Sequence, residues 1–368
     1  MMRNMVKYIN NAVISGSLLL MAACDATIHE YPHPEESFVI LEPHVNREPP
    51  LYYKEVIYDN EWNRTERDLN DVEAHPYDPW EGVEMRLLLE VYEGQINDAR
   101  STGDQARLVE QRELRVHKDA LPPQDTVHVF LPMGDYYVLA WADYCHIDAD
   151  EHNFYDADVL FKVRSEIKNY PMFFHHRSSS AGQESFAIDY SLGPEGYPVI
   201  QADRHTPIQS RVIPILMERP AARYRVLASD FEEFTKDGGS LDGAVVKVVY
   251  RQYVSTGYNV ATCEPNEFIS TYSFNIPLTH DAFGKDGYVS MFGDYLFTSS
   301  DKEDIVIADF YFYDSSGKEF NHCENIEIPL KRNYETVVRG CFLTNKVDKE
   351  SNISIDESFE GEYVVEIN

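Results

Sequence analysis

Short segments in which apolar and polar residues alternate, separated by turn residues, dominate this sequence. In residues 83–92, for example, Met85, Leu87, Leu89 and Val91 occupy alternate positions. Successive side chains of a β-strand point to opposite faces of a sheet, so such a segment presents one apolar face to a core. Many short segments of this kind predict an all-β fold of the sandwich type.

Turn residues between two such segments predict hairpins. Residues 126–131 and 136–142 are joined through Pro132 and Gly134, which predicts one hairpin. A second is expected around Asp314-Ser315-Ser316-Gly317. Further strands are expected at residues 38–41, 107–116, 221–227, 244–250, 333–344 and 362–367. A single short helix is expected at 229–234, capped by Ser229, and residues 60–80 are expected to form a loop.

The N-terminal 23 residues have the pattern of an export signal. Arg3 and Lys7 precede an apolar stretch at residues 12–23, which is shorter than the roughly 20 residues of a membrane-spanning helix. Two alanines stand directly before Cys24, and this ending resembles the bacterial lipobox. We therefore expect residues 1–23 to be a lipoprotein signal peptide and Cys24 to carry acyl chains. An ordinary secretory signal that happens to contain a cysteine is the alternative.

Charge and hydropathy limit the classes of function that remain for this chain. The net charge of −31 argues against nucleic-acid binding, and the acidic residues are spread as on a solvated surface. Residues 24–37 are polar and contain two prolines, so they are expected to tether the first domain. After Cys24 no segment reaches 18 apolar residues, so no further membrane span is expected.

The cysteine spacing does not predict a metal site. Apart from Cys24, the cysteines are Cys145, Cys263, Cys323 and Cys341, and no two form a C-x-x-C pair. An exported chain permits disulfides, so bridges between Cys263 and Cys323 or between Cys323 and Cys341 are alternatives to buried free thiols.

Acidic and histidine residues between His146 and Asp158 form the densest group of metal-ligand types. Asn153 stands where a calcium loop needs its glycine, and Val159 stands where the closing glutamate belongs. A solvated acidic loop is therefore the preferred interpretation. No nucleophile elbow, phosphate-binding loop or zinc-protease motif is present, so neither a cofactor nor an enzymatic activity is expected.

Three segments resemble the fimbrillin and fimbrial-anchor superfamily of Bacteroidales surface proteins. Residues 131–144 contain Gly134-x-Tyr136 followed by Trp141-x-Asp143, residues 217–227 contain Arg219-Pro220-x-Ala222, and residues 328–344 contain Arg332-Asn333-x-x-Thr336-x-x-x-Gly340. The resemblance implies two tandem transthyretin-like Greek-key β-sandwiches, at residues 38–218 and 219–368. Trp141 alternates in phase with Tyr137 and Leu139, so it is expected to fill a core. Arg219-Pro220 is expected to fix the turn between the domains.

The same resemblance implies a fimbria-associated lipoprotein of the cell outer membrane, either an anchor or an accessory subunit. Its partners would be fimbrial subunits, contacted through β-strands. Subunits of this superfamily that polymerise lose an N-terminal strand after proteolysis at an arginine. Arg47 follows the expected first strand here, so a stalk or tip subunit released by cleavage after Arg47 is the alternative to an anchor that keeps Cys24.

A glycan-binding surface lipoprotein is an alternative of a different class. Trp62, Tyr77 and Trp80 lie in the expected loop and could stack on sugar rings. Covering local apolar surface is the simpler role for such aromatic residues.

Overall fold

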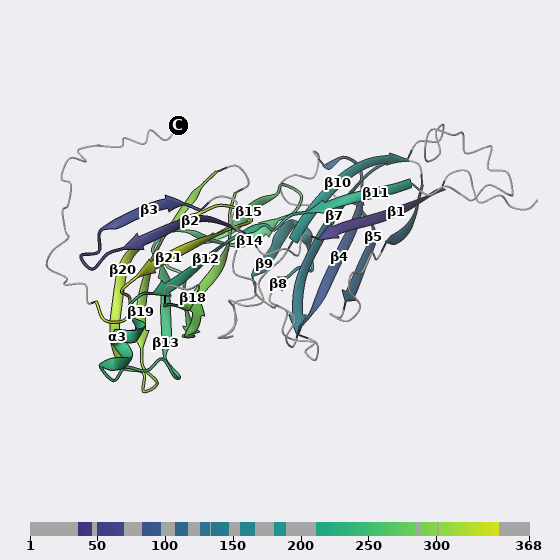
Figure 1. The fold of residues 1–368 in the computed structure, drawn as a ribbon. Coiled ribbons are helices and arrows are strands. Elements are labelled where there is room, and N and C mark those ends of the chain that lie inside the picture. The colour runs from purple at the N-terminus through teal and green to yellow at the C-terminus, as the bar shows by residue number, and fades with distance from the viewer. Residues whose placement is uncertain are drawn as a thin grey trace, which may run out of the picture.

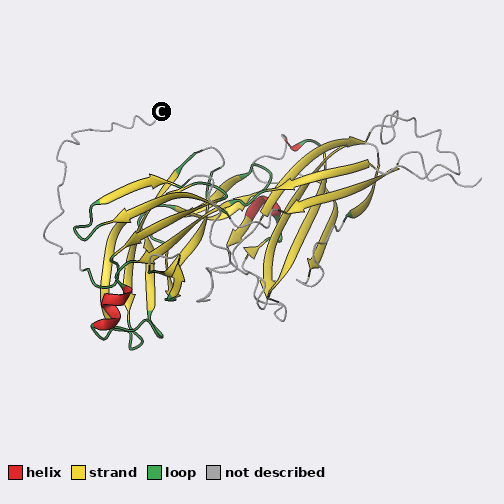
Figure 2. Cartoon of the chain, in the orientation of Figure 1, coloured by secondary structure: helices red, strands yellow, loops and turns green. Residues whose placement is uncertain are grey.

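The computed structural model describes residues 36–45, 50–69, 83–96, 107–116, 126–132, 134–146, 155–165, 180–188, 211–283, 287–299 and 302–345. Strands make up most of these residues, and Figure 2 shows short helices at few places between them. The all-β prediction is confirmed. In the ranges given above, no helix is long and apolar enough to cross a membrane.

The first half of the molecule is a two-layer sandwich. A three-stranded sheet has the order β11 (Arg211–Met217), β1 (Glu36–Val45), β6 (Val127–Pro132). It faces a four-stranded sheet of order β10 (Ser180–Ile188), β7 (Gly134–His146), β4 (Val83–Glu93), β5 (Arg107–Val116). Apolar side chains from both sheets, including Leu41, Leu89, Val138 and Ile215, pack into a shared core.

The second half is a larger sandwich. Its six-stranded sheet has the order β17 (Asp281–Phe283), β18 (Tyr288–Phe297), β12 (Ala221–Ala228), β21 (Tyr334–Gly340), β2 (Leu51–Tyr58), β3 (Arg64–Asp68). The opposing sheet has the order β16 (Ser273–Pro277), β13 (Val245–Tyr250), β19 (Asp304–Tyr313), β20 (Glu319–Leu330). Phe292 and Phe310 meet edge to face in the core between these layers, with ring centroids 4.9 Å apart.

A smaller sheet joins the two sandwiches. Its order is β15 (Glu264–Ile269), β14 (Val254–Asn259), β9 (Val163–Ser165), β8 (Tyr155–Asp156), and η4 (Leu160–Lys162) lies beside it. Trp141 is fully buried in a third core that this sheet covers, which confirms its predicted role. Its ring contacts Tyr155 at 5.3 Å, and Tyr258 and Phe297 at 6.3 Å. One tryptophan thus contacts residues of both halves.

The hairpin predicted through Pro132 and Gly134 is wrong, although both of its strands exist. β6 pairs with β1, whereas β7 pairs with β4 and β10 in the opposite layer. The chain therefore turns a corner between the two layers of the sandwich at this point. The second predicted hairpin is confirmed by the antiparallel pairing of β19 with β20. Asp314 accepts backbone hydrogen bonds from Ser316 and Lys318 across that turn.

Other local predictions needed correction. The expected helix is present as α3 (Phe231–Lys236), but its N-cap residue is Asp230 instead of Ser229, and no side chain makes a capping hydrogen bond. Residues 60–80 are not wholly a loop, because β3 lies within them. β2 was not predicted, and it pairs with β21 in the second sandwich. Residues 51–68 thus share a sheet with strands from beyond residue 219.

Candidate functional site

The strand β1 is the central strand of its sheet, with a neighbour along each edge (Figure 1). It runs parallel to β11, pairing Val39 through Val45 with Arg211 through Met217. On its other edge it runs antiparallel to β6, from Glu36 to Leu41. Removing β1 would leave β11 and β6 without their common neighbour and would open a groove one strand wide.

Side chains of β1 alternate between the core and the surface. Val39 and Leu41 have no exposed surface, whereas Ile40 and Glu42 are half-buried and His44 is exposed. Full burial of a valine or leucine side chain stabilises a fold by roughly 1.5–3 kcal/mol. Burial of Val39 and Leu41 therefore fixes the position and the register of β1.

Pro43 is tolerated in this central strand because the pairing of β1 with β6 stops before it. Proline has no N–H to donate to a neighbouring strand, so it is usually confined to edges and strand ends. The pairing between β1 and β6 stops at Leu41, so at Pro43 only β11 is a paired neighbour. β1 thus behaves as an edge strand from that point.

The outer face of the three-stranded sheet carries large exposed apolar side chains. Phe130 on β6 is 68% exposed, and on β11 Val212 and Leu216 are 49% and 73% exposed. They alternate with core residues of the same strands. Exposed apolar side chains in one region are a common feature of protein contact surfaces.

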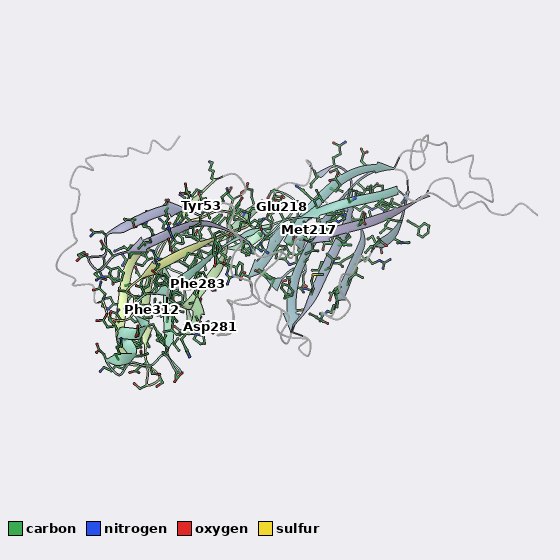
Figure 3. All side chains as sticks on the ribbon, viewed as in Figure 1. Tyr53, Met217, Glu218, Asp281, Phe283 and Phe312 are labelled. Atoms are coloured by element: carbon green, nitrogen blue, oxygen red, sulfur yellow. The ribbon has the colours of Figure 1, made fainter. Side chains whose placement is uncertain are left out.

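Two of the motifs quoted above meet where the two halves join. Arg219 is almost completely buried and donates to Oδ1 of Asn333 at 2.7 Å. The backbone N–H of Asn333 donates to the carbonyl of Ala221 at 3.0 Å, and Arg332 pairs with Glu218 at 3.2 Å. Burial lowers the pKa of Arg219. Figure 3 shows Glu218 and the neighbouring Met217 at the junction between the two halves.

The remaining motif, Trp141-x-Asp143, forms part of a buried polar cluster. Asp143 accepts two hydrogen bonds from Arg86, at 2.9 and 2.6 Å, and one at 2.8 Å from the indole N–H of Trp141. Arg86 also donates to the carbonyl of Tyr155 at 3.0 Å. Burial raises the pKa of Asp143, and the charge and hydrogen bonds of Arg86 and the bond from Trp141 oppose that rise. The cluster supports the junction and offers no exposed reactive group.

The sequence analysis did not predict a second buried ion pair, which Glu335 forms with two arginines. Glu335 on β21 has no exposed surface and pairs with Arg223 at 3.1 Å and with Arg225 at 2.6 Å. The side chain of Arg225 also lies over the Phe283 ring at 5.2 Å. The arginines at alternate positions in residues 221–227 were the only sign of this ion pair in the sequence. Their partner Glu335 lies more than 100 residues away, and only the register of the two strands identifies it.

The residues expected to carry function lie in different parts of the chain. Cys24 and Arg47 lie outside the described residues, as do Tyr77 and Trp80. Trp62 is half-buried, and its ring lies 6.0 Å from Tyr58 and 5.8 Å from Phe342. It therefore covers the core of the second sandwich and is not an open platform for a sugar.

Cysteines and acidic residues form no centre in the described part of the chain. Cys145, Cys263, Cys323 and Cys341 are free thiols, so neither alternative disulfide is present. Asp156 accepts the backbone N–H of Asp158 at 3.3 Å, and most of the expected acidic loop lies outside the described residues. Among those that are described, no three His, Cys, Asp or Glu side chains are grouped to hold a metal.

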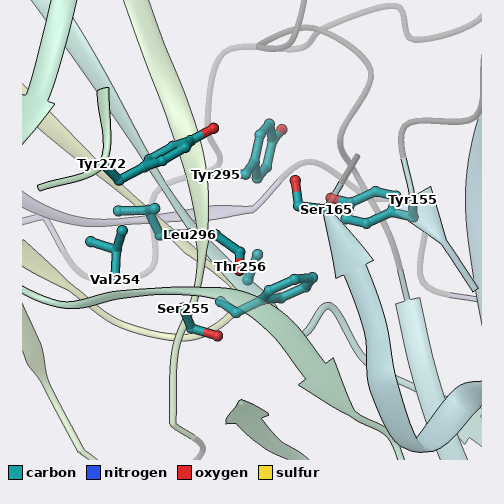
Figure 4. Close-up of a pocket in the computed structure, with 10 residues that line it drawn as sticks. Tyr155, Ser165, Val254, Ser255, Thr256, Tyr272, Tyr295 and Leu296 are labelled. Atoms are coloured by element: carbon teal, nitrogen blue, oxygen red, sulfur yellow. The ribbon is translucent and has the colours of Figure 1, made fainter. Parts of the chain in front are cut away.

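A small cavity lies where β9, β14 and β18 meet (Figure 4). Its volume is about 20 Å³, room for about one water molecule. The lining residues are mostly apolar or aromatic: Tyr155, Ser165, Ala221, Val254, Ser255, Thr256, Tyr272, Tyr295, Leu296 and Phe297. Binding sites for organic ligands are usually 300–1,000 Å³, so this cavity is a packing defect at the junction.

Solved structures with similar architecture come from Bacteroides and Porphyromonas. A candidate adhesin from Bacteroides ovatus has 13% identity and a TM-score of 0.38, over 82% of this chain and 89% of that one. The fimbrial anchor protein Mfa2 from Porphyromonas gingivalis has 10% identity and a TM-score of 0.36, over 75% and 82%. The tip fimbrial protein Mfa3 of the same organism has 11% and 0.33, over 80% and 81%. Similarity at this level does not transfer a function.

Sequence comparison assigns the chain to a family. No curated protein sequence matches it significantly. A family model matches residues 57–368, which is most of the chain. The protein therefore belongs to DUF6562, a family of unknown function.

Proposed function

We propose that this protein is a lipid-anchored component of a bacterial surface fimbria, acting through β-strand contacts with fimbrial subunits. The observation that carries the proposal is the position of β1 between β11 and β6. A strand from another protein could use the same hydrogen-bonding edges only after β1 had left. The state of the N-terminal segment therefore determines whether the chain can accept such a strand.

Two sequence features bracket that strand. Cys24, the proposed lipid attachment site in the outer membrane, lies 12 residues before Glu36, so β1 starts at most about 40 Å from the acyl chains. Arg47 comes two residues after the end of β1 in the sequence. A chain that is not cut after Arg47 keeps β1 and its lipid together and acts as an anchor or accessory subunit. Cleavage after Arg47 would release both and give a polymerising stalk or tip subunit.

The exposed apolar side chains on the same sheet support a protein partner. Phe130, Val212 and Leu216 project from the two strands that flank β1. A subunit that contacts this sheet would cover them and gain apolar burial. Trp62 packs on a core instead, so it does not favour glycan binding.

Two domains are also proposed. The sandwiches correspond to residues 38–218 and 219–368, each of the transthyretin-like type implied by the sequence resemblance, with residues 51–68 contributed by the first part of the chain to the second sandwich. The pairing of β2 with β21 supports this addition.

Intact mass and N-terminal peptide analysis of the protein from native cell-surface material tests the role. An acylated Cys24 at the N-terminus is expected for an anchor. A lipid-free chain that begins at Glu48 would contradict the anchor and identify a polymerising subunit. Co-purification of fimbrial subunits is expected in either case, and its absence would contradict the fimbrial assignment.

Lipid attachment itself is tested by changing one cysteine. Cys24→Ala should move the protein from the outer-membrane fraction to a soluble fraction, because the acyl chains provide its membrane affinity. Cys263→Ala is the matched control, since it removes a thiol in a folded domain, and it should leave the protein in the membrane fraction. Retention of Cys24→Ala in the membrane would contradict lipid anchoring at this residue.

A further inference from the structure

Two backbone segments cross from the first sandwich to the second in the same direction. β1 is followed by β2 after residues 46–50, and β11 is followed by β12 after residues 218–220. β1 is parallel to β11, while β2 and β12 are both parallel to β21, which lies between them. Figure 1 shows β1 pointing from the far end of the first sandwich toward the second. β1 and β2 therefore run in the same direction, one in each sandwich.

The second strand of this segment is strongly held. Val56 is fully buried and Tyr58 is nearly so, both in the second core. The hydroxyl of Tyr58 accepts the backbone N–H of Glu327 at 2.9 Å. Glu55 is buried between two arginines, Arg67 on β3 and Arg339 on β21, the latter at 3.4 Å. β2 is thus joined to each of its neighbours by an ion pair as well as by backbone pairing.

The parallel arrangement decides how these contacts respond to a pull. In a parallel pair, the N-terminal end of one strand and the C-terminal end of the other lie at opposite ends. Pulling those two ends apart slides β2 along β21. Hydrogen bonds between strands lie across the strand direction, so sliding loads all of them together. Pulling both strands from the same end would instead break the bonds one after another.

We propose that β1 and β2 together carry tension from the N-terminus directly to the second sandwich. β1 is itself held by β11 and β6. The load that it passes on is resisted by the sliding contacts of β2 with β21 and β3, where the first rupture occurs. The body of the first sandwich, residues 83–188, lies off this path. The inference goes beyond the proposed function, because any pull between the two ends of the chain would load this path.

Single-molecule pulling of the full mature chain, with handles fused at its two ends, tests the path. Glu55→Gln removes one charge from the ion pairs of β2 and should lower the force of the first rupture. Glu61→Gln is the matched control, because the same change is made in the exposed turn after β2. Val129→Ala weakens the core of the first sandwich beside β1 and should leave the first rupture force unchanged.

A second geometry keeps the test independent of any variant. Moving the N-terminal handle to the turn at residues 59–63 places both pulls at the same end of the β2–β21 pair, so this pair should peel at a lower force. Equal forces in the two geometries would overturn the proposal. So would a first rupture that is weakened by Val129→Ala and not by Glu55→Gln. The measurement needs neither membrane nor partner, so its failure is distinguishable from a failure of lipid anchoring or fimbrial binding.

Discussion

Replacing Trp141 with alanine should remove a large part of the stability of the molecule. The side chain is fully buried at the junction of the two halves. A tryptophan buries about 200 Å². At about 25 cal/mol per Å² that burial contributes about 5 kcal/mol, of which alanine keeps a small part.

Hydrogen bonding adds to this loss. The indole N–H donates to Asp143 at 2.8 Å, and its removal leaves that carboxylate with Arg86 as its main partner. Loss of one hydrogen bond to a charged group costs roughly 1.5–3 kcal/mol when nothing replaces it. Burial worked out from area is an upper estimate, and changes of this kind usually total 3–5 kcal/mol, so we expect about 5 kcal/mol for Trp141→Ala, the top of that range. Domains of ordinary stability unfold with 5–15 kcal/mol.

Urea unfolding followed by circular dichroism measures this loss, and the m-value shows whether unfolding remains one transition. Trp141→Phe keeps a ring and loses the donor, so it should cost clearly less than alanine. Trp62→Ala should also cost less, because Trp62 is half-buried at the edge of its core. A loss below about 1 kcal/mol for Trp141→Ala would refute the reasoning, since truncating a well-packed tryptophan lowers the free energy of unfolding by more than that.

Three further changes test other contacts. Gly182→Ala would place a Cβ against the carbonyl oxygen of Leu216, so we expect a loss of about 1–3 kcal/mol in urea unfolding, and a neutral result would contradict the close packing. Iodoacetamide at about pH 8 should label Cys341 before Cys145, because Cys145 is buried and burial raises its pKa to about 11; mass spectrometry of early time points gives the order. Burial raises the pKa of Glu90, so folding favours its protonated form and its contribution to stability is lost as the pH rises above about 4.5. Glu90→Gln should therefore gain stability relative to wild type between acidic and neutral pH, and a constant difference across that range would contradict the assignment.

Strands with regular alternation could be predicted from the sequence alone. Residues 83–92 were expected as a strand from the alternation of Met85, Leu87, Leu89 and Val91, and β4 covers Val83–Glu93. Residues 107–116 were also expected as a strand, and β5 has those bounds although its alternation is less regular. β2 was missed because its pairing with β21 shifts register between Tyr52 and Glu55, and its buried positions do not alternate cleanly. A local irregularity of the backbone removes the period on which such predictions depend.

Partners that are distant in sequence could not be predicted. The corner at Pro132 and Gly134 has the composition of a hairpin turn, and only the pairing of β6 with β1 shows that the strands belong to opposite layers. In the same way, Asn333 looked like part of a strand motif, while its contact with Arg219 depends on how two sandwiches dock. Composition predicts elements, whereas contacts between elements follow from the assembled fold.

The outermost strands of two sheets have a consequence for the protein at high concentration. β5 ends the four-stranded sheet of the first sandwich, and β3 ends the six-stranded sheet of the second. Both are rich in charged residues: β5 reads RLVEQRELRV and β3 reads RTERD. An open strand edge invites pairing with any extended chain, and closely spaced charges oppose such pairing. At high concentration, copies of the protein are thereby kept from joining one another along these edges, which limits aggregation.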